Sequence, residues 1–356
     1  MVMELLEYMG RNEHEQLVVC HEPSVGLKAF IAIHDTTLGP SCGGLRIWPH
    51  ISEEAAITDV LRLSRAMTYK SAVAGLPLGG GKALIWADSR KDKSEALLRA
   101  FGRFVDTLGG RYITTEDVGM TPADLEFVAE ETEHVVGLPV SMGGSGDTSE
   151  MTGLGVYLGM KAAGKAAWGS DSLEGKVIAL QGFGNVGFNT AGHLLAEGAS
   201  LIVTDTYDGA LVRARDMGAT VVEPDAIYDV ECDIFAPCAL GGTLNADTIP
   251  RLRCSVVAGG ANNQLASDAD GDELDRRGIL FAPDFVINSG GIINAANELD
   301  GVYRPERARE ITERIYETTS RVIATSREED VPTYVAANRL AERRIESVRN
   351  LRGIYR

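Results

Sequence analysis

The chain has 356 residues, 44% hydrophobic and 24% charged, which is the composition of a globular protein with two, at most three, domains. Its 34 lysines and arginines stand against 51 aspartates and glutamates, and this net charge of -17, without a run of basic residues, excludes nucleic acid as an expected partner. No stretch approaches about 18 apolar residues in a row, so no membrane span is expected either.

The first half of the chain alternates short apolar runs with amphipathic segments. The strands expected from the apolar runs are 27–34, 83–87 and 112–115. The helices expected from apolar residues three and four positions apart, or from a capped start, are 53–69, 94–108 and a segment beginning at Pro122. A glycine- and serine-rich stretch at 141–149 then has the composition of an interdomain hinge.

Beyond this stretch, strands and helices alternate regularly. The expected strands are 176–181, 200–204, 233–236, 255–258 and 279–282. A helix at 152–167 precedes them, and a helical tail at 305–343, broken at Pro332, follows and could pack on either domain. Such alternation predicts parallel strands with right-handed crossovers, which form a doubly wound α/β sheet.

Residues 182–187 form a GxGxxG pattern between an expected strand and an expected helix. Gly182 would permit the tight turn, Gly184 would let the backbone approach a pyrophosphate, and Gly187 would let helix and strand pack closely. Asp205, at the end of the next strand, would accept hydrogen bonds from a ribose 2′-OH and repel a 2′-phosphate, which predicts NAD as the cofactor. The same loop includes Phe183, Asn185 and Val186. The alternative is a glycine turn that binds nothing.

Further cofactor contacts are expected at the carboxyl ends of the strands, where ligands bind in open α/β sheets. This set comprises Cys238, Ala239, Asn262, Asn288 and, at the start of the helix 152–167, Thr152. Asn262 and Asn288 are expected to face the nicotinamide. Alternatively, the two asparagines only cap helices or turns.

In the first half, Lys70 and Lys82 bracket an apolar segment and a predicted glycine turn at 79–81. Lys82 directly precedes an apolar strand, which should draw its side chain inward. A buried lysine near another cation has a lowered pKa and can act as a base near neutral pH. Asp117 follows the strand 112–115, a common place for a catalytic carboxylate. The alternative is a pair of solvated surface lysines.

Several motifs occur in a fixed order along the chain: 43–46 (GGLR), Lys70, 78–82 (LGGGK), 116–119 (EDVG), 182–187, 261–264 (ANNQ), 288–291 (NSGG) and 334–342. Together they resemble the glutamate/leucine/phenylalanine/valine dehydrogenase family, most closely its leucine dehydrogenase branch, from about residue 10 to the end. The resemblance implies NAD-dependent, reversible oxidative deamination of a branched-chain L-amino acid to a 2-oxo acid and ammonia. It also implies a homo-oligomer.

The resemblance gives each catalytic residue a role. Lys70 would hold the substrate α-carboxylate, Lys82 would activate water as general base, and Asp117 would carry protons to and from the amino nitrogen. The backbone of Gly43 and Gly44 would form the floor of the site. The implied fold is α/β with two domains separated by a cleft. The substrate and oligomerisation domain would be 1–140 plus 330–356, and the Rossmann-type NAD domain would be 141–329.

The family separates its substrates at a few pocket positions, which are here Cys42, Thr115, Ile292 and Ala295, with Asn262 nearby. Glutamate dehydrogenases carry a lysine where this chain has Cys42, so glutamate should be rejected. The pocket is aliphatic and suits leucine, isoleucine or valine, with phenylalanine as runner-up. The stretch 145–150 lacks the two prolines usual in leucine dehydrogenases and gains two acidic residues, which could loosen the hinge.

Two other functions remain compatible with a dinucleotide fold. A non-catalytic NAD-binding sensor would not need Lys82 and Asp117, yet both are present. A 2-hydroxy-acid dehydrogenase commonly uses a histidine paired with a carboxylate, and no histidine here lies beside a carboxylate in a glycine-flanked loop. The five cysteines without a CxxC pair and the six histidines without HxxxH spacing predict free thiols and no metal. Residues 1–7 do not resemble a signal peptide, so we expect a cytoplasmic protein.

Overall fold

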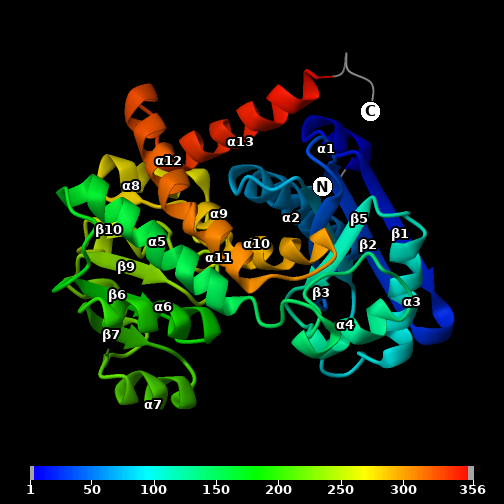
Figure 1. The fold of residues 1–356 in the computed structure, drawn as a ribbon, viewed down its shortest axis with the longest axis horizontal. Coiled ribbons are helices and arrows are strands. Elements are labelled where there is room, and N and C mark those ends of the chain that lie inside the picture. The colour runs from blue at the N-terminus through cyan, green and yellow to red at the C-terminus, as the bar shows by residue number, and fades with distance from the viewer. Residues whose placement is uncertain (1–3, 352–356) are drawn as a thin grey trace. The chain divides into compact units, whose positions relative to one another are not determined.

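The computed structural model describes residues 4–351, which divide into two compact units (Figure 1). The first unit comprises the chain up to Asp147, the segment Asn294–Pro305 and the chain from Ala341 on; the second comprises Thr148–Ile293 and Glu306–Leu340. The first domain predicted from the sequence includes residues 1–3 and 352–356, and residues 1–3 are also part of the segment that was judged not to resemble a signal peptide. Both terminal segments lie outside the described residues.

The observed division differs from the predicted boundaries at 140/141 and 329/330, and hydrogen bonds explain the difference. The carboxylate of Glu298 accepts from the backbone N–H of Gly137 and of Ser145, which ties 294–305 to the first unit. Thr333 Oγ1 donates to the carbonyl of Phe281 at 2.6 Å, which ties the chain after residue 330 to the second unit. Neither contact joins neighbours in the sequence, so no local pattern predicts it.

The first unit contains a five-stranded sheet of order β1-β2-β4-β3-β5. Its strands are β1 (Gln16–Glu22), β2 (Leu27–Asp35), β3 (Ser41–Ile47), β4 (Gly79–Ile85) and β5 (Tyr112–Glu116). β2 runs antiparallel to both of its neighbours, whereas β3 runs parallel to β4 and to β5. The carboxyl ends of the three parallel strands β3, β4 and β5 therefore lie at the same end of the sheet.

Helices cover both faces of this sheet and bury alternate residues of its strands. The helices are α1 (Leu5–Arg11), α2 (Glu53–Val73), α3 (Glu95–Asp106) and α4 (Pro122–Ala129). Ile31 and Ile85 pack with Phe101 of α3 in one cluster, and Leu84 packs with Val60 and Leu61 of α2 in another. Adjacent strand residues point to opposite faces, so each strand contributes to two cores.

The glycines 79–81 are not a turn, which corrects that prediction: they form the first half of β4 and are buried. A Cβ on Gly79 would lie 2.0 Å from the carbonyl oxygen of Asp35, and a Cβ on Gly80 would lie 2.1 Å from Thr68 Oγ1. The glycines thus allow β2 and α2 to approach the strand closely. β1 and β3 were also not predicted as strands.

The second unit contains a six-stranded sheet of order β11-β10-β9-β6-β7-β8 in which all neighbours are parallel, a Rossmann-like arrangement. The strands are β6 (Val177–Gln181), β7 (Ser200–Thr204), β8 (Thr220–Val221), β9 (Ile234–Pro237), β10 (Val256–Val257) and β11 (Leu280–Phe281). Ala179, Phe235 and Val257 of the central strands lie in one buried cluster with Leu274. The doubly wound α/β prediction is confirmed.

The helices of the second half begin with α5 (Ser149–Trp168), which contacts both α6 and α12. The others are α6 (Asn185–Ala196), α7 (Asp208–Asp216), α8 (Asp268–Arg276), α9 (Asp284–Ile287), α10 (Gly290–Ala296), α11 (Pro305–Glu313), α12 (Ile315–Glu329) and α13 (Thr333–Arg349). The break predicted at Pro332 falls between α12 and α13, where Asp330 has a left-handed φ of 52°.

Within residues 4–351, no helix is both long enough and apolar enough to cross a membrane. The same residues contain no group of three or more histidine, cysteine, aspartate or glutamate side chains placed to hold a metal ion. The structure describes all five cysteines, and none forms a disulfide.

Candidate active site

Lys82 is a buried charged residue at the centre of the first sheet. It lies in β4 on the face that it shares with Leu84, towards α2, and only 6% of the residue is exposed. The expectation that its neighbours draw it inward is confirmed. Its Nζ lies 2.6 Å from Oδ2 of Asp117, the second residue of the predicted catalytic pair.

Asp117 directly follows β5 and is held by two cations. Arg46, in β3, donates from Nε to the same Oδ2 at 3.0 Å and from Nη1 to Asp59 at 3.0 Å. Burial alone would raise the pKa of Asp117, but the Lys82 ammonium and the Arg46 guanidinium outweigh it and hold that pKa well below its ordinary value. Asp117 is therefore ionised at neutral pH and accepts hydrogen bonds only.

Arg46 is a site residue to which the sequence analysis gave no role. It was noted only as part of the GGLR motif, because its partner Asp117 is 71 positions away in the chain. The signal available in the sequence was its position directly after Gly43, Gly44 and Leu45 in that motif. Parallel pairing of β3 with β5 brings the two residues to the same edge of the sheet.

The predicted floor of the site, Gly43 and Gly44, lies in β3 between its two parallel neighbours. A Cβ on Gly43 would come within 1.7 Å of the Gly81 carbonyl oxygen, and a Cβ on Gly44 within 2.7 Å of the Asp117 Cβ. Tyr112 Oη donates to the Gly43 carbonyl at 2.7 Å and fixes this backbone. A side chain on Gly43 would displace β4, and one on Gly44 would displace the backbone that leads to Asp117.

Lys70 lies in the last turn of α2, where a cation interacts favourably with the helix dipole. α2 packs directly against β4, the strand of Lys82. The structure therefore brings the two predicted lysines onto packed elements of the same unit.

Three of the four predicted specificity positions lie in the first unit, and Ile292 lies in the second. Cys42 is fully buried in β3 and is paired in register with Gly80, while Thr115 is paired with Gly44. Burial raises the pKa of the Cys42 thiol to about 12, a shift that Glu298 increases and Lys82 opposes. Ala295, on α10, is buried as well.

Two further carboxylates distinguish this unit. Burial, followed by repulsion from Asp147 and Asp117, raises the pKa of Glu116 to about 7. Glu298 accepts hydrogen bonds at 2.7 Å from Ser145 N–H and at 3.0 Å from Gly137 N–H. The sequence analysis named neither Glu116 nor Glu298 as a functional residue, since nothing in their local sequence marks them.

In the second unit, residues 182–187 connect β6 to α6, as the GxGxxG pattern predicts. Gly182 has a φ of +96°, which favours glycine, and a Cβ on it would lie 2.7 Å from the backbone nitrogen of Ala239. A Cβ on Gly187 would lie 2.3 Å from the Gly182 carbonyl oxygen, whereas one on Gly184 would meet nothing within 4 Å. Gly184 is also the N-cap of α6 and supplies no side-chain cap, so the helix N-terminus is open to an anion.

Asp205 lies after β7 and orders the glycine loop. Its Oδ2 accepts from the Phe183 N–H at 2.6 Å, and its Oδ1 accepts from the Tyr207 N–H at 2.9 Å. A carboxylate has about four acceptor positions, so capacity remains for a ribose hydroxyl. The contact with Phe183 adds a structural role that the sequence did not indicate.

The asparagines at the carboxyl ends of the strands are connected to each other. Asn288 Nδ2 donates to Asn262 Oδ1 at 2.8 Å and to the Gly260 carbonyl at 3.2 Å, and the N–H of Gly260 approaches Cys238 Sγ at 3.3 Å. The Oδ1 of Asn288 is buried and has no hydrogen-bond partner, so it is available to an amide donor such as a nicotinamide carboxamide. Thr152, also buried, donates to the carbonyl of Thr148.

These features fit a dinucleotide. They combine a glycine-rich turn, an open helix N-terminus, a carboxylate at the end of the second strand and an unsatisfied amide oxygen, all at the carboxyl ends of the strands. The first unit supplies a buried lysine and a carboxylate in contact, which suits proton transfer.

Comparison with known proteins identifies the family of the chain. Residues 14–134 match the family described as Glu/Leu/Phe/Val dehydrogenase, dimerisation domain. Residues 143–223 and 212–353 match the family Glutamate/Leucine/Phenylalanine/Valine dehydrogenase. The matched ranges cover most of the chain.

Individual relatives are similar over nearly their whole length. A leucine dehydrogenase of Bacillus cereus is 56% identical over 100% of this chain and 97% of its own. A phenylalanine dehydrogenase of Caldalkalibacillus thermarum is 44% identical over 97% of this chain and 94% of its own. The crystal structure of L-tryptophan dehydrogenase from Nostoc punctiforme, 48% identical, superposes with a TM-score of 0.84 over 97% of this chain and 99% of that one.

Proposed function

The chain belongs to the Glu/Leu/Phe/Val dehydrogenase family and is an amino acid dehydrogenase, and we propose that it deaminates leucine, and also isoleucine and valine. The reaction is the reversible, NAD-dependent oxidation of the L-amino acid to the 2-oxo acid and ammonia. The observation that carries the proposal is the contact between the buried Lys82 and Asp117 in a chain 56% identical to a leucine dehydrogenase over its full length.

The residues of the first unit would perform the proton transfers. Lys70, at the C-terminal turn of α2, would hold the substrate carboxylate. Asp117, kept ionised by Lys82 and Arg46, would accept a proton from the substrate nitrogen and return it when ammonia leaves. Lys82 would take a proton from the water that adds to the imine carbon. The backbone of Gly43 would keep the floor of the site free of side chains.

NAD would accept the hydride released from the substrate Cα. The loop 182–187 and the N-terminus of α6 would hold its pyrophosphate, Asp205 its ribose, and Asn288 its carboxamide. A 2′-phosphate would lie next to the Asp205 carboxylate, so NAD is preferred to NADP. We also propose that the protein works as a homo-oligomer, since the family matched by residues 14–134 is described as a dimerisation domain. We further propose a cytoplasmic location, which the free cysteines favour.

The substrate preference follows from Cys42, a buried and uncharged side chain near Lys82. A second substrate carboxylate placed beside it would have no cationic partner, and burying an unpaired charge is costly. Glutamate is therefore excluded, while an aliphatic side chain is accepted. Relatives named for tryptophan and phenylalanine are less identical to this chain than the leucine dehydrogenases.

The test is NADH formation by the purified enzyme with leucine, isoleucine, valine, phenylalanine and glutamate, each with NAD⁺ and with NADP⁺. We expect the highest kcat/KM with leucine and NAD⁺ and none detectable with glutamate. Higher kcat/KM with phenylalanine would replace the substrate assignment, and no activity with any amino acid would refute the function.

A further inference from the structure

Cys232 and Cys254 face each other in the second sheet, just before β9 and β10. Glu231 and Arg253 form a parallel bridge immediately before them, and Ile234 pairs with Val256 immediately after. The two cysteines therefore occupy one in-register position between the same two chain segments, and the N–H of Cys232 donates to the Arg253 carbonyl at 3.2 Å.

This register suits a disulfide. Parallel strands lie about 4.8 Å apart, and in-register side chains project from the same side of the sheet. A disulfide spans Cα atoms that are about 4.4–6.8 Å apart. The two thiols are close enough for each to shift the pKa of the other. Little movement of the backbone is needed to join them.

The surroundings activate one of the two sulfurs. The neighbouring Cys232 thiol and, more weakly, the backbone of Phe235 and the guanidinium of Arg277 lower the pKa of Cys254 against the opposing effect of burial, whereas the neighbouring Cys254, burial and nearby Asp233 raise that of Cys232. Arg277 donates from Nη2 to the Leu252 carbonyl, and its buried Nη1 has no hydrogen-bond partner. That N–H is available to a thiolate.

The other three cysteines of the chain lack these features. Burial raises the pKa of Cys20 and of Cys42 to about 12, and that of Cys238 to about 11. The thiolate is the reactive form of cysteine, so these three are expected to be inert in the folded protein.

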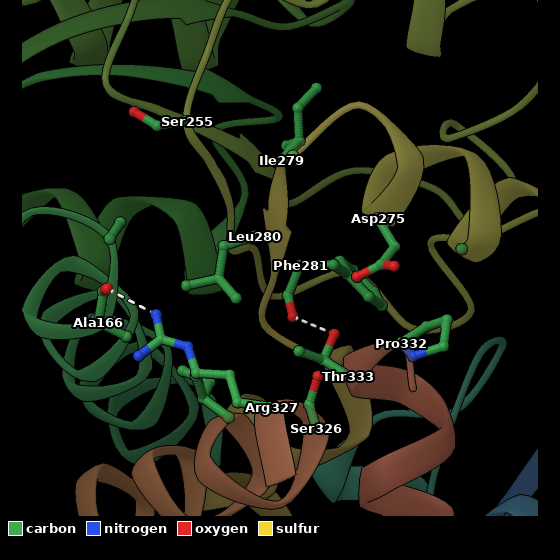
Figure 2. A pocket seen from close by; sticks show the side chains of 14 residues that line it. Ala166, Ser255, Asp275, Ile279, Leu280, Phe281, Ser326, Arg327, Pro332 and Thr333 are labelled. Carbon is green, nitrogen blue, oxygen red and sulfur yellow. Dashed lines mark hydrogen bonds between the residues drawn. The ribbon is translucent and has the colours of Figure 1, made fainter. Parts of the chain in front are cut away.

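A small oxidant can reach the pair from solvent. Both cysteines are half-buried and line a surface cavity of about 570 Å³ together with Glu231, Arg253 and Arg277. A second cavity of about 330 Å³ lies next to the first, between α5, α8, α12 and β11 (Figure 2). Ser255, the residue after Cys254, and Ile279 line both cavities. This side of the sheet lies at the amino ends of the strands, away from the glycine loop and Asn288 at their carboxyl ends.

We propose that Cys232 and Cys254 are a redox-active dithiol that hydrogen peroxide or an organic hydroperoxide converts to a reversible disulfide. The Cys254 thiolate attacks the peroxide, the O–O bond breaks, and the departing hydroxide takes a proton to become water, which leaves a sulfenic acid on Cys254. The Cys232 sulfur then attacks the Cys254 sulfur, the S–O bond breaks, and the oxygen leaves as a second water with the Cys232 proton. Two thiols and one hydrogen peroxide thus yield one disulfide and two waters, and a small thiol reverses the step by exchange.

The test counts thiols in the full-length enzyme treated with hydrogen peroxide, by alkylation in denaturant and peptide mass spectrometry. The untreated enzyme has five alkylatable thiols. We expect the oxidised enzyme to have three, with one cross-linked peptide pair containing Cys232 and Cys254, and reductant to restore all five. Cys254→Ser should keep its four remaining thiols, and Cys232→Ser should give a sulfenic acid on Cys254 that dimedone traps.

Cys238→Ser is the matched control, because it removes a thiol of the same unit and should leave the cross-link unchanged. The proposal is overturned if all five thiols survive peroxide, if the cross-link joins other cysteines, or if it joins two chains. These outcomes are independent of the amino acid dehydrogenase assay.

Discussion

Replacing Lys82 by alanine tests the base that the proposed reaction needs. Lys82 is 6% exposed, contacts Asp117 at 2.6 Å, and shares that carboxylate with Arg46 at 3.0 Å. Arg46 cannot replace it, because a guanidinium does not give up its proton in proteins. Loss of a positioned base typically costs about 10²- to 10⁴-fold, or about 3–5 kcal/mol of barrier, and we expect kcat to fall by this amount.

Two controls separate chemistry from folding. In Lys82→Ala, Asp117 keeps Arg46, so the loss of stability should be smaller than the about 3–5 kcal/mol typical of a buried charge left alone. Lys93→Ala breaks a lysine–aspartate contact of similar length, 2.7 Å to Asp124, outside the site. Lys82→Arg keeps a positive charge at this position but replaces the amine with a guanidinium, which does not give up its proton in proteins. We expect Lys93→Ala to keep the parent kcat and Lys82→Arg to be as slow as Lys82→Ala.

The measurements are kcat for leucine oxidation, Kd for NADH from fluorescence titration, and Tm. The Kd should stay within about threefold of the parent value in all three variants, since the predicted NAD residues lie in the second unit. The reasoning is refuted if Lys82→Ala retains kcat within tenfold of the parent, or if Lys82→Arg is fully active, because Lys82 would then act by its charge alone.

Three further substitutions probe the carboxylates. Asp205→Ser removes the acceptor for the Phe183 N–H and the charge opposed to a 2′-phosphate, so KM for NAD⁺ should rise about tenfold and the NAD⁺/NADP⁺ ratio of kcat/KM should fall. Asp147→Asn removes a like charge from Glu116, so the pKa of Glu116, now about 7, should drop towards 4.5. A raised folded-state pKa favours folding below about pH 4.5, and this contribution is lost as pH rises through about 7. The variant should therefore have a higher Tm than the parent only at higher pH, and its free energy of unfolding should increase there by less than about 1 kcal/mol because Asp147 is exposed. Glu298→Ala leaves two backbone N–H groups without their acceptor and should lower the free energy of unfolding by about 3 kcal/mol in urea titration, whereas Glu298→Gln, which still accepts, should lose less.

The glycine loop shows what a sequence can predict well. β6 ends at Gln181 and α6 begins at Asn185, so the turn between them is determined by the local sequence. Gly182, with its φ of +96°, is the kind of residue that such a turn requires. The regular spacing of β6, β7 and β9 likewise follows from short apolar runs whose periodicity is visible in a single chain. Local patterns suffice to predict these elements, although the pairing of β6 with β9 joins residues more than 50 positions apart.

β3 shows where such reasoning fails. Its sequence, Ser41–Ile47, contains two adjacent glycines that disfavour a strand, and only pairing on both sides with β4 and β5 makes it one. The glycines 79–81 look like a turn for the same reason. Contacts with Asp35 and Thr68, distant in the chain, decide their conformation. Glu298 was missed because its partners lie more than 150 positions away.

The two cations on Asp117 are not equivalent, and their chemistry assigns different roles to them. Arg46 also binds Asp59, so its guanidinium is fixed between two carboxylates and supplies a permanent positive charge. Lys82 comes from a different strand and carries an ammonium, which can exchange its proton with substrate or water. Either cation can keep Asp117 ionised, but only Lys82 can transfer a proton. This division explains why β3 and β4 each bring one cation to the same oxygen of Asp117: the Arg46 contact maintains the carboxylate while the proton of Lys82 is in use.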